Sequence, residues 1–381
     1  MGEVGSLNRG KSKHRPRNDS RLYGGKYPFI QTGDVAKAGL LLEKHNQTYS
    51  EFGIEQSKLW SKGTLVITIA ANIAGTSILN INAAFPDSII GFESQNTDMI
   101  FIKNAIDHLS NKLKSKAETS SQANLNLAKL SELKIVIPNF EEQTSIGVFF
   151  NKLENLIAQN EHKLDLLKQL KQAYLQKIFS QELRFAGFSG TWEQRKLGKI
   201  GNTFNGLTGK TKEDFGHGDA KFVTYLNVFQ NELATLKQLD SVEIDEQQNQ
   251  VQKGDVFFTT SSETPEEVGM SSVWTYDIKN IYLNSFTFGY RPTVELDLEY
   301  LATMLRSPSV RKKITFLAQG ISRYNISKSK MMKIEVPIPN IFEQENIGSL
   351  FKQLDNLITL NQKKLNLLKK QKQAYLQKMF I

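Results

Sequence analysis

Basic and amide side chains gather at several places in this sequence, in types that suit contacts to a nucleic acid. Arginine and lysine can bind phosphates or donate to guanine, and asparagine and glutamine can pair with adenine edges. The formal net charge of +9 also favours a polyanionic partner. One group lies near the start of the chain and a second near residue 210; they comprise Arg9, Lys11, Lys13, Arg15 and Arg17, and Thr208, Lys210 and Lys212.

Further candidates stand beside apolar, strand-like runs, from which their side chains could reach a groove of DNA. They are Gln31 and Thr32, their counterparts Thr224 and Tyr225, and the run Arg323, Tyr324 and Asn325 that precedes the last strand of the second half. A basic stretch near a terminus is often only a solvated tail. The internal counterpart of this stretch favours binding instead, and we predict that all these residues contact DNA.

The run Gly5–Ser12, GSLNRGKS, matches the phosphate-loop pattern G-x-x-x-x-G-K-S. Such a loop needs a buried strand before it and a helix after it. Only MGEV precedes this run, and KHRPRND, which does not begin a helix, follows it. The counterpart in the second half has Leu207 where the lysine should stand, so we do not expect nucleotide binding here.

Other chemistry is missing from the sequence. There is no cysteine, and the five histidines lack metal-ligand spacing, so we expect neither a metal site nor a catalytic residue in this chain. No apolar run reaches the roughly 18 residues of a membrane span. The N-terminus has no apolar segment behind its basic residues, so we expect a cytoplasmic protein without a membrane partner.

The chain repeats itself, and the repeat defines its organisation. Segments Pro138–Phe179 and Pro339–Phe380 align without a gap, with more than half of their positions identical. Weaker matches precede each copy, including MGEVGSLNRGK at the start with LGKIGNTFNGLTGK from Leu197, and NLAK (126–129) with NISK (325–328). We predict four regions: globular domain 1–140, helical region 141–180, globular domain 181–339 and helical region 340–381.

Each repeated segment carries apolar residues at alternating spacings of four and three, which is typical of a coiled-coil seam. Each helix would span about 50 Å. The seam residues are Ile146, Phe150, Leu153, Ile157, Asn160, Leu164, Leu167 and Tyr174 in the first copy, and Ile347, Phe351, Leu354, Ile358, Asn361, Leu365, Leu368 and Tyr375 in the second. In an antiparallel pair the two central asparagines would meet and could hydrogen-bond, which would fix the register.

Two alternatives remain open for these helices: the asparagines could lie at an exposed edge, or the helices could pair between two chains. Leu156 and Leu357 widen the apolar face beyond a two-helix seam, as do Phe149 and Leu350. Such surplus apolar surface could receive a partner protein.

The regions between the helices are predicted to be mixed α/β domains. Strand-like runs are 27–31, 64–70, 134–137, 256–260 and 333–336, and helix-like runs are 98–116 and 298–316, the latter interrupted by Ser-Pro at 307–308. The predicted fold is therefore α+β, with two α/β domains alternating with two long helices that pair as an antiparallel coiled coil.

This arrangement resembles the specificity subunit of type I restriction–modification enzymes over essentially the whole chain. The resemblance is carried by P-x-x-x-E-Q-x-x-I-G with L-x-x-x-K-x-x-Y-L-Q-K, present twice, and by G-F-x-G-x-W-E-x-x-K-L-G at Gly187–Gly198. The first domain lacks that last segment in full and begins at Met-Gly where the second has Leu-Gly. The resemblance therefore leaves the edge of the first domain in doubt.

The resemblance implies a non-catalytic subunit that reads a bipartite, asymmetric site in double-stranded DNA, with one half-site for each domain. Two N6-adenine methyltransferase subunits and two restriction subunits would be its partners, and S-adenosylmethionine, ATP and magnesium would be bound by those partners. Two other classes stay open on the residues alone: a coiled-coil interaction protein without DNA specificity, and a stand-alone NTPase using Gly5–Ser12.

Overall fold

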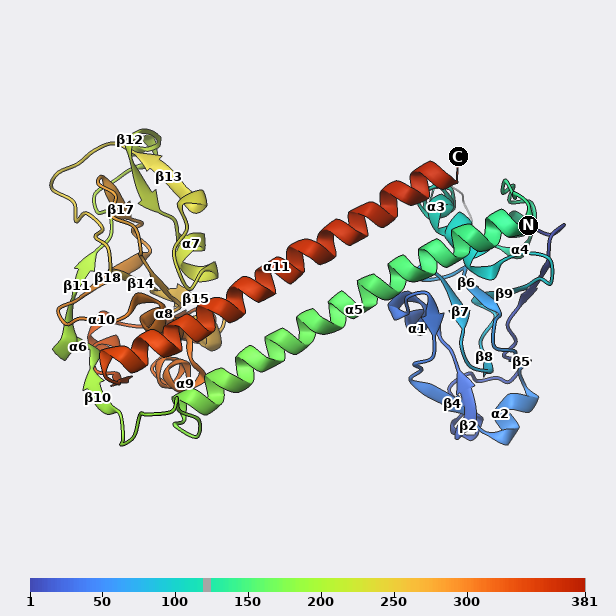
Figure 1. Ribbon diagram of the computed structural model, residues 1–381, viewed down its shortest axis with the longest axis horizontal. Helices are drawn as coiled ribbons and strands as arrows, with labels where there is room; N and C mark the ends of the chain where they lie inside the picture. Colours follow the sequence, from blue (N-terminus) through green and yellow to red (C-terminus); the bar gives the residue numbers. More distant parts are fainter. Residues whose placement is uncertain (119–124, 381) are drawn as a thin grey trace. The chain divides into compact units, whose positions relative to one another are not determined.

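The computed structural model describes residues 1–118 and 125–380, and the chain divides into two compact units. Unit 1 comprises Met1–Leu164 and Asn361–Ile381, and unit 2 comprises Asp165–Leu360. Each unit contains one globular part and a part of each of two long helices, α5 (Phe140–Phe179) and α11 (Ile341–Met379), drawn green and red in Figure 1. The mixed α and β content agrees with the predicted fold class.

Unit 1 is built on two small sheets. The five-stranded sheet has the order β1 (Ser6–Arg9), β9 (Ile89–Glu93), β6 (Leu65–Thr68), β7 (Thr76–Leu79) and β3 (Leu41–Leu42). The four-stranded sheet has the order β4 (Gln47–Tyr49), β2 (Tyr23–Phe29), β8 (Ala83–Ala84) and β5 (Leu59–Trp60). The helices of this globular part are η1 (Ser20–Leu22), α1 (Thr32–Lys37), α2 (Glu51–Glu55), α3 (Met99–Glu118) and α4 (Leu127–Ser131).

Unit 2 contains four smaller sheets or strand pairs. Their orders are β11 (Gly201–Asn205), β18 (Thr287–Pro292), β14 (Val256–Thr259), β16 (Ser271–Val273); β13 (Leu239–Val242), β12 (Phe215–Val223), β17 (Ile281–Leu283); β10 (Glu193–Lys196) with β20 (Glu335–Ile338); and β15 (Ser261–Ser262) with β19 (Tyr324–Asn325). Its helices are α6 (Leu197–Ile200), η2 (Lys212–Asp214), α7 (Tyr225–Gln230), η3 (Leu236–Gln238), η4 (Pro265–Glu267), α8 (Leu298–Arg306), α9 (Pro308–Phe316) and α10 (Lys328–Met331).

The repeated E-Q-x-x-I-G motif joins each long helix to its own globular part. In unit 1, the buried Gln143 accepts a hydrogen bond from the Asp98 backbone N–H at 3.1 Å and donates to the Pro138 carbonyl at 2.9 Å. Gln344 makes the same two bonds in unit 2, to Asp297 and Pro339. These side chains satisfy backbone groups at a buried helix junction, which explains why the motif occurs twice.

The glycine of the same motif allows a close approach of the helix to the domain. A Cβ atom on Gly147 would lie 2.3 Å from the Asp98 carboxylate, and one on Gly348 would lie 2.3 Å from the Asp297 carboxylate. Each of these carboxylates caps a domain helix, since Asp98 accepts from the Phe101 N–H and Asp297 does so from Tyr300. A larger residue at either glycine would displace that cap.

The start of the chain occupies the place that the sequence alignment gave it. The Met1 ammonium donates to the Leu133 carbonyl at 2.7 Å, and the Gly2 N–H donates to the Ser131 carbonyl at 3.0 Å. In unit 2, Leu197 and Gly198 make the equivalent bonds to Ile334 and Met332, both at 3.0 Å. The match of Met-Gly with Leu-Gly is therefore confirmed.

Two details of the sequence analysis were wrong. Residues 134–137, expected as a strand, form none, because the partner that β10 provides to β20 in unit 2 has no equivalent strand here within the described ranges. The match of NLAK with NISK is displaced by two residues, since the equivalent helix caps are Asn126 and Ser327. The expected interruption at Ser307-Pro308 is confirmed: α8 ends there and α9 begins with the proline, which lacks a backbone N–H.

The two long helices run antiparallel within each unit. In unit 1, the rings of Phe149 and Tyr375 lie 4.9 Å apart, while Glu161, further along α5, pairs with Lys369, earlier in α11, at 2.7 Å. The helices therefore fill their seam within one chain, as the first of the sequence hypotheses proposed.

A cross-helix ion pair occurs once in each unit, at equivalent positions of the repeat. Lys372 bonds Glu154 in unit 1, and Lys171 bonds Asp355 at 2.7 Å in unit 2. Burial opposes the charge on Lys171, but the carboxylates of Glu232 and Asp355 raise its pKa above the ordinary value. Lys171 and Lys372, which hold equivalent positions of the repeat, thus lie at helix contacts.

The central asparagines are buried, with 5% of Asn160 and 6% of Asn361 exposed, so they do not lie at an exposed edge. The Asn160 amide donates to the Leu156 carbonyl of its own helix at 2.7 Å. Tyr375, a predicted seam residue, is 40% exposed. In the other copy Tyr174 is half-buried and Leu175 is buried instead, because the last turn of α5 packs against the core of unit 2.

Candidate DNA-binding surfaces

The basic stretch of unit 1 is a folded loop rather than a loose tail. It leaves β1 after Arg9 and is attached to the unit by backbone contacts: the Lys13 N–H donates to the Gln56 carbonyl at 3.0 Å, and Ser57 Oγ donates to the Lys11 carbonyl at 2.6 Å. The side chains of Arg9, Lys11, Lys13, Arg15 and Arg17 are all exposed. The loop can therefore present several cations from a fixed backbone.

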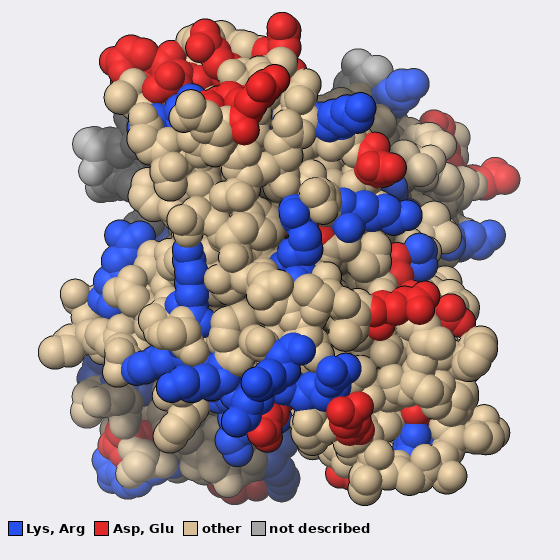
Figure 2. All heavy atoms as spheres, turned by 90° about the vertical axis from the view of Figure 1, so that its left-hand side faces the viewer, with Lys and Arg blue, Asp and Glu red and all other residues tan. Residues whose placement is uncertain are grey.

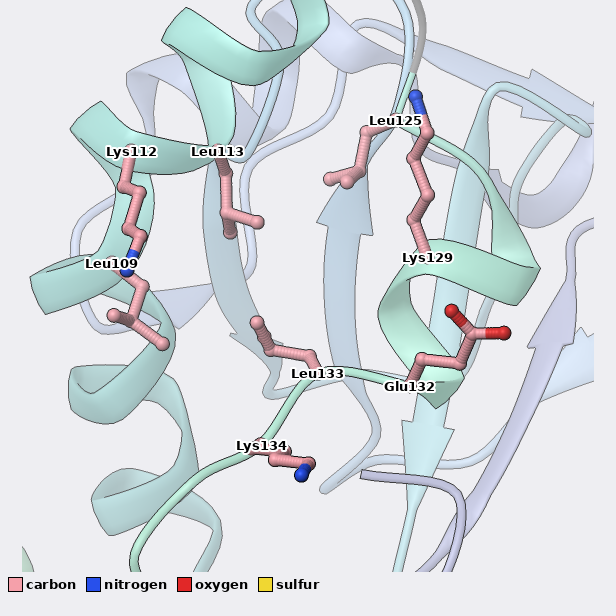
Figure 3. A pocket seen from close by; sticks show the side chains of 8 residues that line it. All are labelled: Leu109, Lys112, Leu113, Leu125, Lys129, Glu132, Leu133 and Lys134. Atoms are coloured by element: carbon pink, nitrogen blue, oxygen red, sulfur yellow. The ribbon is translucent and has the colours of Figure 1, made fainter.

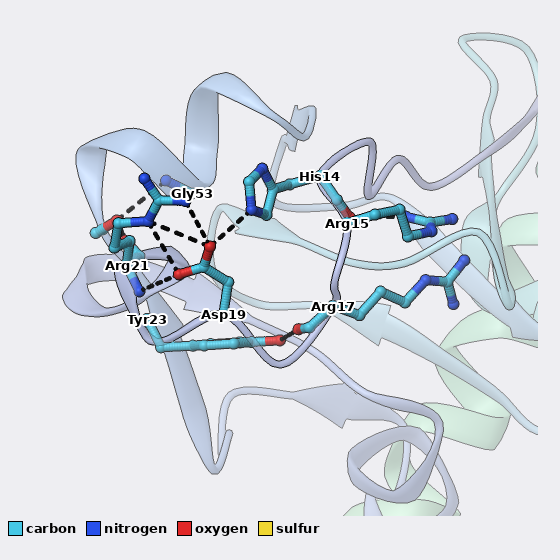
Figure 4. Close-up of polar contacts among 8 residues, drawn as sticks. His14, Arg15, Arg17, Asp19, Arg21, Tyr23 and Gly53 are labelled. Atoms are coloured by element: carbon cyan, nitrogen blue, oxygen red, sulfur yellow. Dashed lines mark hydrogen bonds and ion pairs between the residues drawn. The ribbon is translucent and has the colours of Figure 1, made fainter.

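An ionic cluster at the far end of this loop fixes its return into β2. Asp19 pairs with His14 at 2.8 Å and with Arg21 at 2.7 Å, and the hydrogen bonds from Arg21 hold the pKa of the Asp19 carboxyl well below its usual range. Tyr23 Oη donates to the Arg17 carbonyl at 2.6 Å. Figure 4 shows the guanidinium groups of Arg15 and Arg17 projecting to one side, away from this cluster.

Not every arginine of the loop is equally available for phosphate. Arg17 pairs with Asp87 at 2.6 Å, although both side chains are more than two-fifths exposed. Arg15 donates to the carbonyls of Ser12 and His14, at 2.6 and 2.8 Å. Because exposed pairs of this kind are weak, a phosphate could compete for either guanidinium group.

The phosphate-loop pattern at Gly5–Ser12 has the wrong structure for binding nucleotides. Its centre forms β1, an antiparallel strand in which Leu7 lies opposite Phe92. No helix follows Ser12 directly; the next helical turn is η1 at Ser20. The run therefore lacks the helix that follows directly on the loop in a phosphate-binding loop.

Gln31 and Thr32 occupy the same place in unit 1 as Thr224 and Tyr225 in unit 2. Gln31 and Thr224 are the N-cap residues of α1 and α7, and Thr32 and Tyr225 are the first residues of those helices. The Gln31 amide donates to Gln47 at 2.6 Å and stays exposed. The alignment thus identified equivalent positions. Gln31 is exposed, and Thr32, Thr224 and Tyr225 are half-buried.

Two residues of the predicted basic loop of unit 2, Thr208 and Lys210, are bonded to other residues of that unit. Lys210 pairs with Asp245 at 2.8 Å and is 15% exposed, and the hydrogen bond to Asp245 raises the pKa of the lysine. The Thr208 N–H donates to Gln248 at 3.0 Å. Lys212 is exposed. Figure 2 shows acidic side chains gathered at the top of this unit, the end at which β12 and β13 lie in Figure 1.

A second surface of unit 2 brings together candidates that are far apart in the sequence. β19, with Tyr324 and Asn325, pairs with β15, and the Tyr225 hydroxyl donates to the carbonyl of Ser261 in β15 at 2.8 Å. Burial raises the pKa of the Tyr225 hydroxyl, an effect that the nearby exposed Arg323 opposes. Tyrosine, arginine and asparagine thus meet around one short strand pair.

Sequence reasoning missed two neighbours of this surface, Lys328 and Phe286. Lys328 donates to Asn205, and its ammonium lies 5.8 Å from the centre of the Phe288 ring. Phe286 is 68% exposed, and its carbonyl accepts from Thr260 at 2.9 Å. We call Asn205, Tyr225, Phe286, Arg323, Tyr324, Asn325 and Lys328 the β15 surface. A phenylalanine among polar residues, in the sequence NSFT at 284–287, was the available signal for Phe286.

The close-up in Figure 3 shows a different kind of cavity, in unit 1, with a volume of about 550 Å³. Leu113, Leu125 and Leu133 point into the space between α3 and α4, and three lysines and Glu132 line it. This lining offers no paired carboxylates and no nucleophile beside a base. Within residues 1–118 and 125–380, no cluster of acidic or histidine side chains is arranged to hold a metal, and no helix is long and apolar enough to cross a membrane.

The chain belongs to the family of type I restriction modification DNA specificity domains, whose model matches residues 1–169 and 189–370. It is 21% identical over 378 residues to the type I restriction enzyme MjaVIII specificity subunit of Methanocaldococcus jannaschii, covering 91% of this chain and 84% of that protein. A putative MjaX specificity subunit of the same organism is 25% identical over 66% of this chain and 59% of its own length.

The fold agrees with this assignment. A crystal structure of the S subunit of a type I restriction–modification system from M. genitalium matches with a TM-score of 0.62 at 16% identity, covering all of this chain and 94% of that one. A structure from a study of complex assembly and conformational transition of the type I system matches with a TM-score of 0.59 at 15% identity, covering all of this chain and 96% of that one.

Proposed function

We propose that this chain is the specificity subunit that selects a two-part site in double-stranded DNA, with one half-site read by each unit. The observation that carries the proposal is the contrast between repeated and non-repeated parts. The residues that join each unit to its long helix are the same in both, whereas the candidate contact surfaces differ in residue type and position. Different surfaces on a common skeleton should read different half-sites, which makes the site asymmetric.

Each unit presents side chains that suit contacts to one half of the DNA site. In unit 1, the exposed cations of the 9–17 loop would contact phosphates, which supply affinity and position the protein. In unit 2, Arg323 and Asn325 of the β15 surface would read base edges, with Tyr225 and Phe286 giving apolar contact. The family assignment favours this function over a coiled-coil interaction protein without DNA specificity.

The long helices would hold the partner subunits. Leu156 and Leu357 are 38% and 44% exposed at equivalent positions of the repeat, which would provide one apolar docking position per copy. Two N6-adenine methyltransferase subunits, using S-adenosylmethionine, and two restriction subunits, using ATP and magnesium, would supply the catalysis. This chain would supply specificity only.

A genome-wide map of 6-methyladenine tests the proposal, made with and without this gene in cells that carry the cognate methyltransferase subunit. One split motif that appears only with the gene is the expected result, and it would give both half-sites. If no gene-dependent motif appeared although both proteins were expressed and associated, the interaction-protein alternative would replace this proposal.

The helices offer a second test, because half-sites read from one face of DNA lie about one helical turn, roughly 34 Å, apart. Inserting one heptad at equivalent positions of both helices should lengthen the spacer and leave both half-sites unchanged. A change in the bases that are read would contradict the role of the helices as a spacer.

A further inference from the structure

Unit 2 contains a cavity of about 820 Å³ between α9, α10 and the start of β20. Three apolar side chains line it: Phe316, which is 88% exposed, the half-buried Leu317 and the buried Ile334. The rest of the lining is polar and consists of Ser309, Lys312, Lys313, Lys330, Lys333 and Glu335. Apolar walls are thus combined with four lysines and a single carboxylate.

The lysines of this cavity are available for external contacts. Lys312, Lys313 and Lys333 are exposed, and Lys330 is half-buried. Lys313 donates to the backbone carbonyl of Glu335 at 2.7 Å, and among the residues that the structure describes none of the four lysines pairs with a carboxylate. The positive charge beside the apolar walls can therefore be compensated by an anionic group from outside the chain.

The cavity between α3 and α4 in unit 1, shown in Figure 3, is the counterpart of this one. With the helix caps of α4 and α10 as equivalent positions, Lys129 aligns with Lys330, and Leu133 aligns with Ile334. All four of these residues line their cavities, and each cavity combines apolar side chains with one carboxylate and at least three lysines. The same combination of side chains thus occurs at one equivalent place in both units.

We propose that these two cavities, which we call the lysine cavities, are docking sites for an acidic, amphipathic helix of a partner polypeptide, with one helix bound to each unit. Apolar side chains on one face of the helix would enter the cavity, as in other complexes in which a helix binds a groove. Carboxylates beside that face would pair with the lysines. This inference does not depend on DNA reading.

The lining selects this occupant over the phosphates of DNA. Phosphates would gain from the lysines but not from the apolar walls, whereas an acidic amphipathic helix gains from charge complementarity and from burial of apolar surface. Phe316 adds an exposed apolar ring beside the cavity, which is typical of a protein interaction site. The candidate DNA-binding surfaces also differ between the units, while this cavity recurs, which fits a partner that binds both units with the same chemistry.

The test uses the full chain and a fluorescein-labelled synthetic peptide helix with leucine on one face and glutamate on the other. Fluorescence anisotropy should show saturable binding with one site in each unit. Lys129→Glu and Lys330→Glu should each weaken one of the two sites at least about tenfold, because a carboxylate would then face the glutamates of the peptide. The same peptide with lysine in place of every glutamate should not bind.

Phe316→Ala tests the apolar contact at the site of unit 2. In a chain that also carries Lys129→Glu, it should weaken peptide binding by roughly fivefold or more, since the phenyl ring would lose its buried contact. The matched control is Phe342→Ala, which changes another exposed phenylalanine of unit 2, outside the cavity, and should leave binding unchanged.

The same variants identify any other occupant. Absence of peptide binding, or binding that is indifferent to both Lys330→Glu and Phe316→Ala, would overturn the proposal. If Phe316→Ala lowered affinity for duplex DNA as much as for the peptide, the cavity would be a DNA contact instead. Self-association of the chain that Phe316→Ala abolishes, without peptide binding, would overturn the proposal in favour of a second copy as occupant.

Discussion

Unit 1 and unit 2 attach their long helices with the same residues. They differ in what covers the glutamate beside that junction. Gln143 and Gln344 make identical bonds to the domain helix caps, whereas Glu142 is exposed and Glu343 is buried against Arg184 and Trp192. The difference shows that repeated sequence fixes the junction itself. The surroundings of the junction depend on segments that occur only once.

The largest expected effect concerns these two glutamates. Glu343→Ala should destabilise unit 2 by about 3–5 kcal/mol, because it leaves Arg184 without its buried partner. Glu142→Ala should change stability by less than about 0.5 kcal/mol, as surface substitutions usually do. Urea unfolding of both variants measures the contrast. Equal effects would mean that Glu142 has a buried partner in solution.

A second difference between the units lies at Arg306 of unit 2. It donates to the carbonyls of Ser271, Val228, Phe229 and Asn231, and so closes the end of α7; burial lowers its pKa to about 10. Nine residues after the helix cap, where unit 2 has Arg306, unit 1 has Asp107, which pairs with Lys103 at 2.7 Å.

Arg306→Met should cost about 2–3 kcal/mol, because it leaves buried carbonyls without donors. It should also disturb recognition of the second half-site, since α7 carries Tyr225. Thermal unfolding and a methylation map of the variant give the two readings. Unchanged stability would show that water replaces the guanidinium group.

DNA-binding measurements should distinguish the β15 surface of unit 2 from its 208–212 loop. Arg323→Ala should lower affinity for DNA by roughly tenfold and relax the second half-site, whereas Lys328→Ala should lower affinity for all sequences and reduce the salt slope by about one. Lys210→Ala is the control, because its ammonium is paired with Asp245. The measurement is anisotropy with labelled duplexes at several salt concentrations, using the chain with its methyltransferase partner. An effect of Lys210→Ala as large as that of Arg323→Ala would move the contact surface to the 208–212 loop.

The smallest effect concerns pH and the loop of unit 1. Because Asp19 has a lowered pKa in the folded state, its contribution to stability is fully present above its ordinary value of 3.8 and is lost only as the pH falls below it. The 9–22 loop should therefore keep its structure from pH 8 to pH 5. Chemical shifts of the Asp19 carboxyl, followed by NMR with Asp19→Asn as the reference, test this. Titration near the ordinary value would contradict the Arg21 contact.

Much of the architecture could be predicted from the repeat. The two helices, the Met-Gly match and the break at Ser307-Pro308 all follow from residues whose roles are local: apolar spacing, an aligned dipeptide and a proline without an N–H. The candidate contact residues could be predicted only as groups. Whether Lys210 is available to DNA depends on Asp245, 35 residues away, and no local pattern shows that pair.

The sequence by itself determined the repeated scaffold, because helix periodicity and the E-Q-x-x-I-G junction act through neighbouring residues and recur in both copies. Only the tertiary structure decided which side chains share a surface. It brought Tyr225 to β15 and β19, and it placed Arg184 and Trp192 on Glu343 while Glu142 stayed exposed. Such contacts join segments that are distant in the chain, and burial and pairing at them depend on the folded backbone rather than on local spacing.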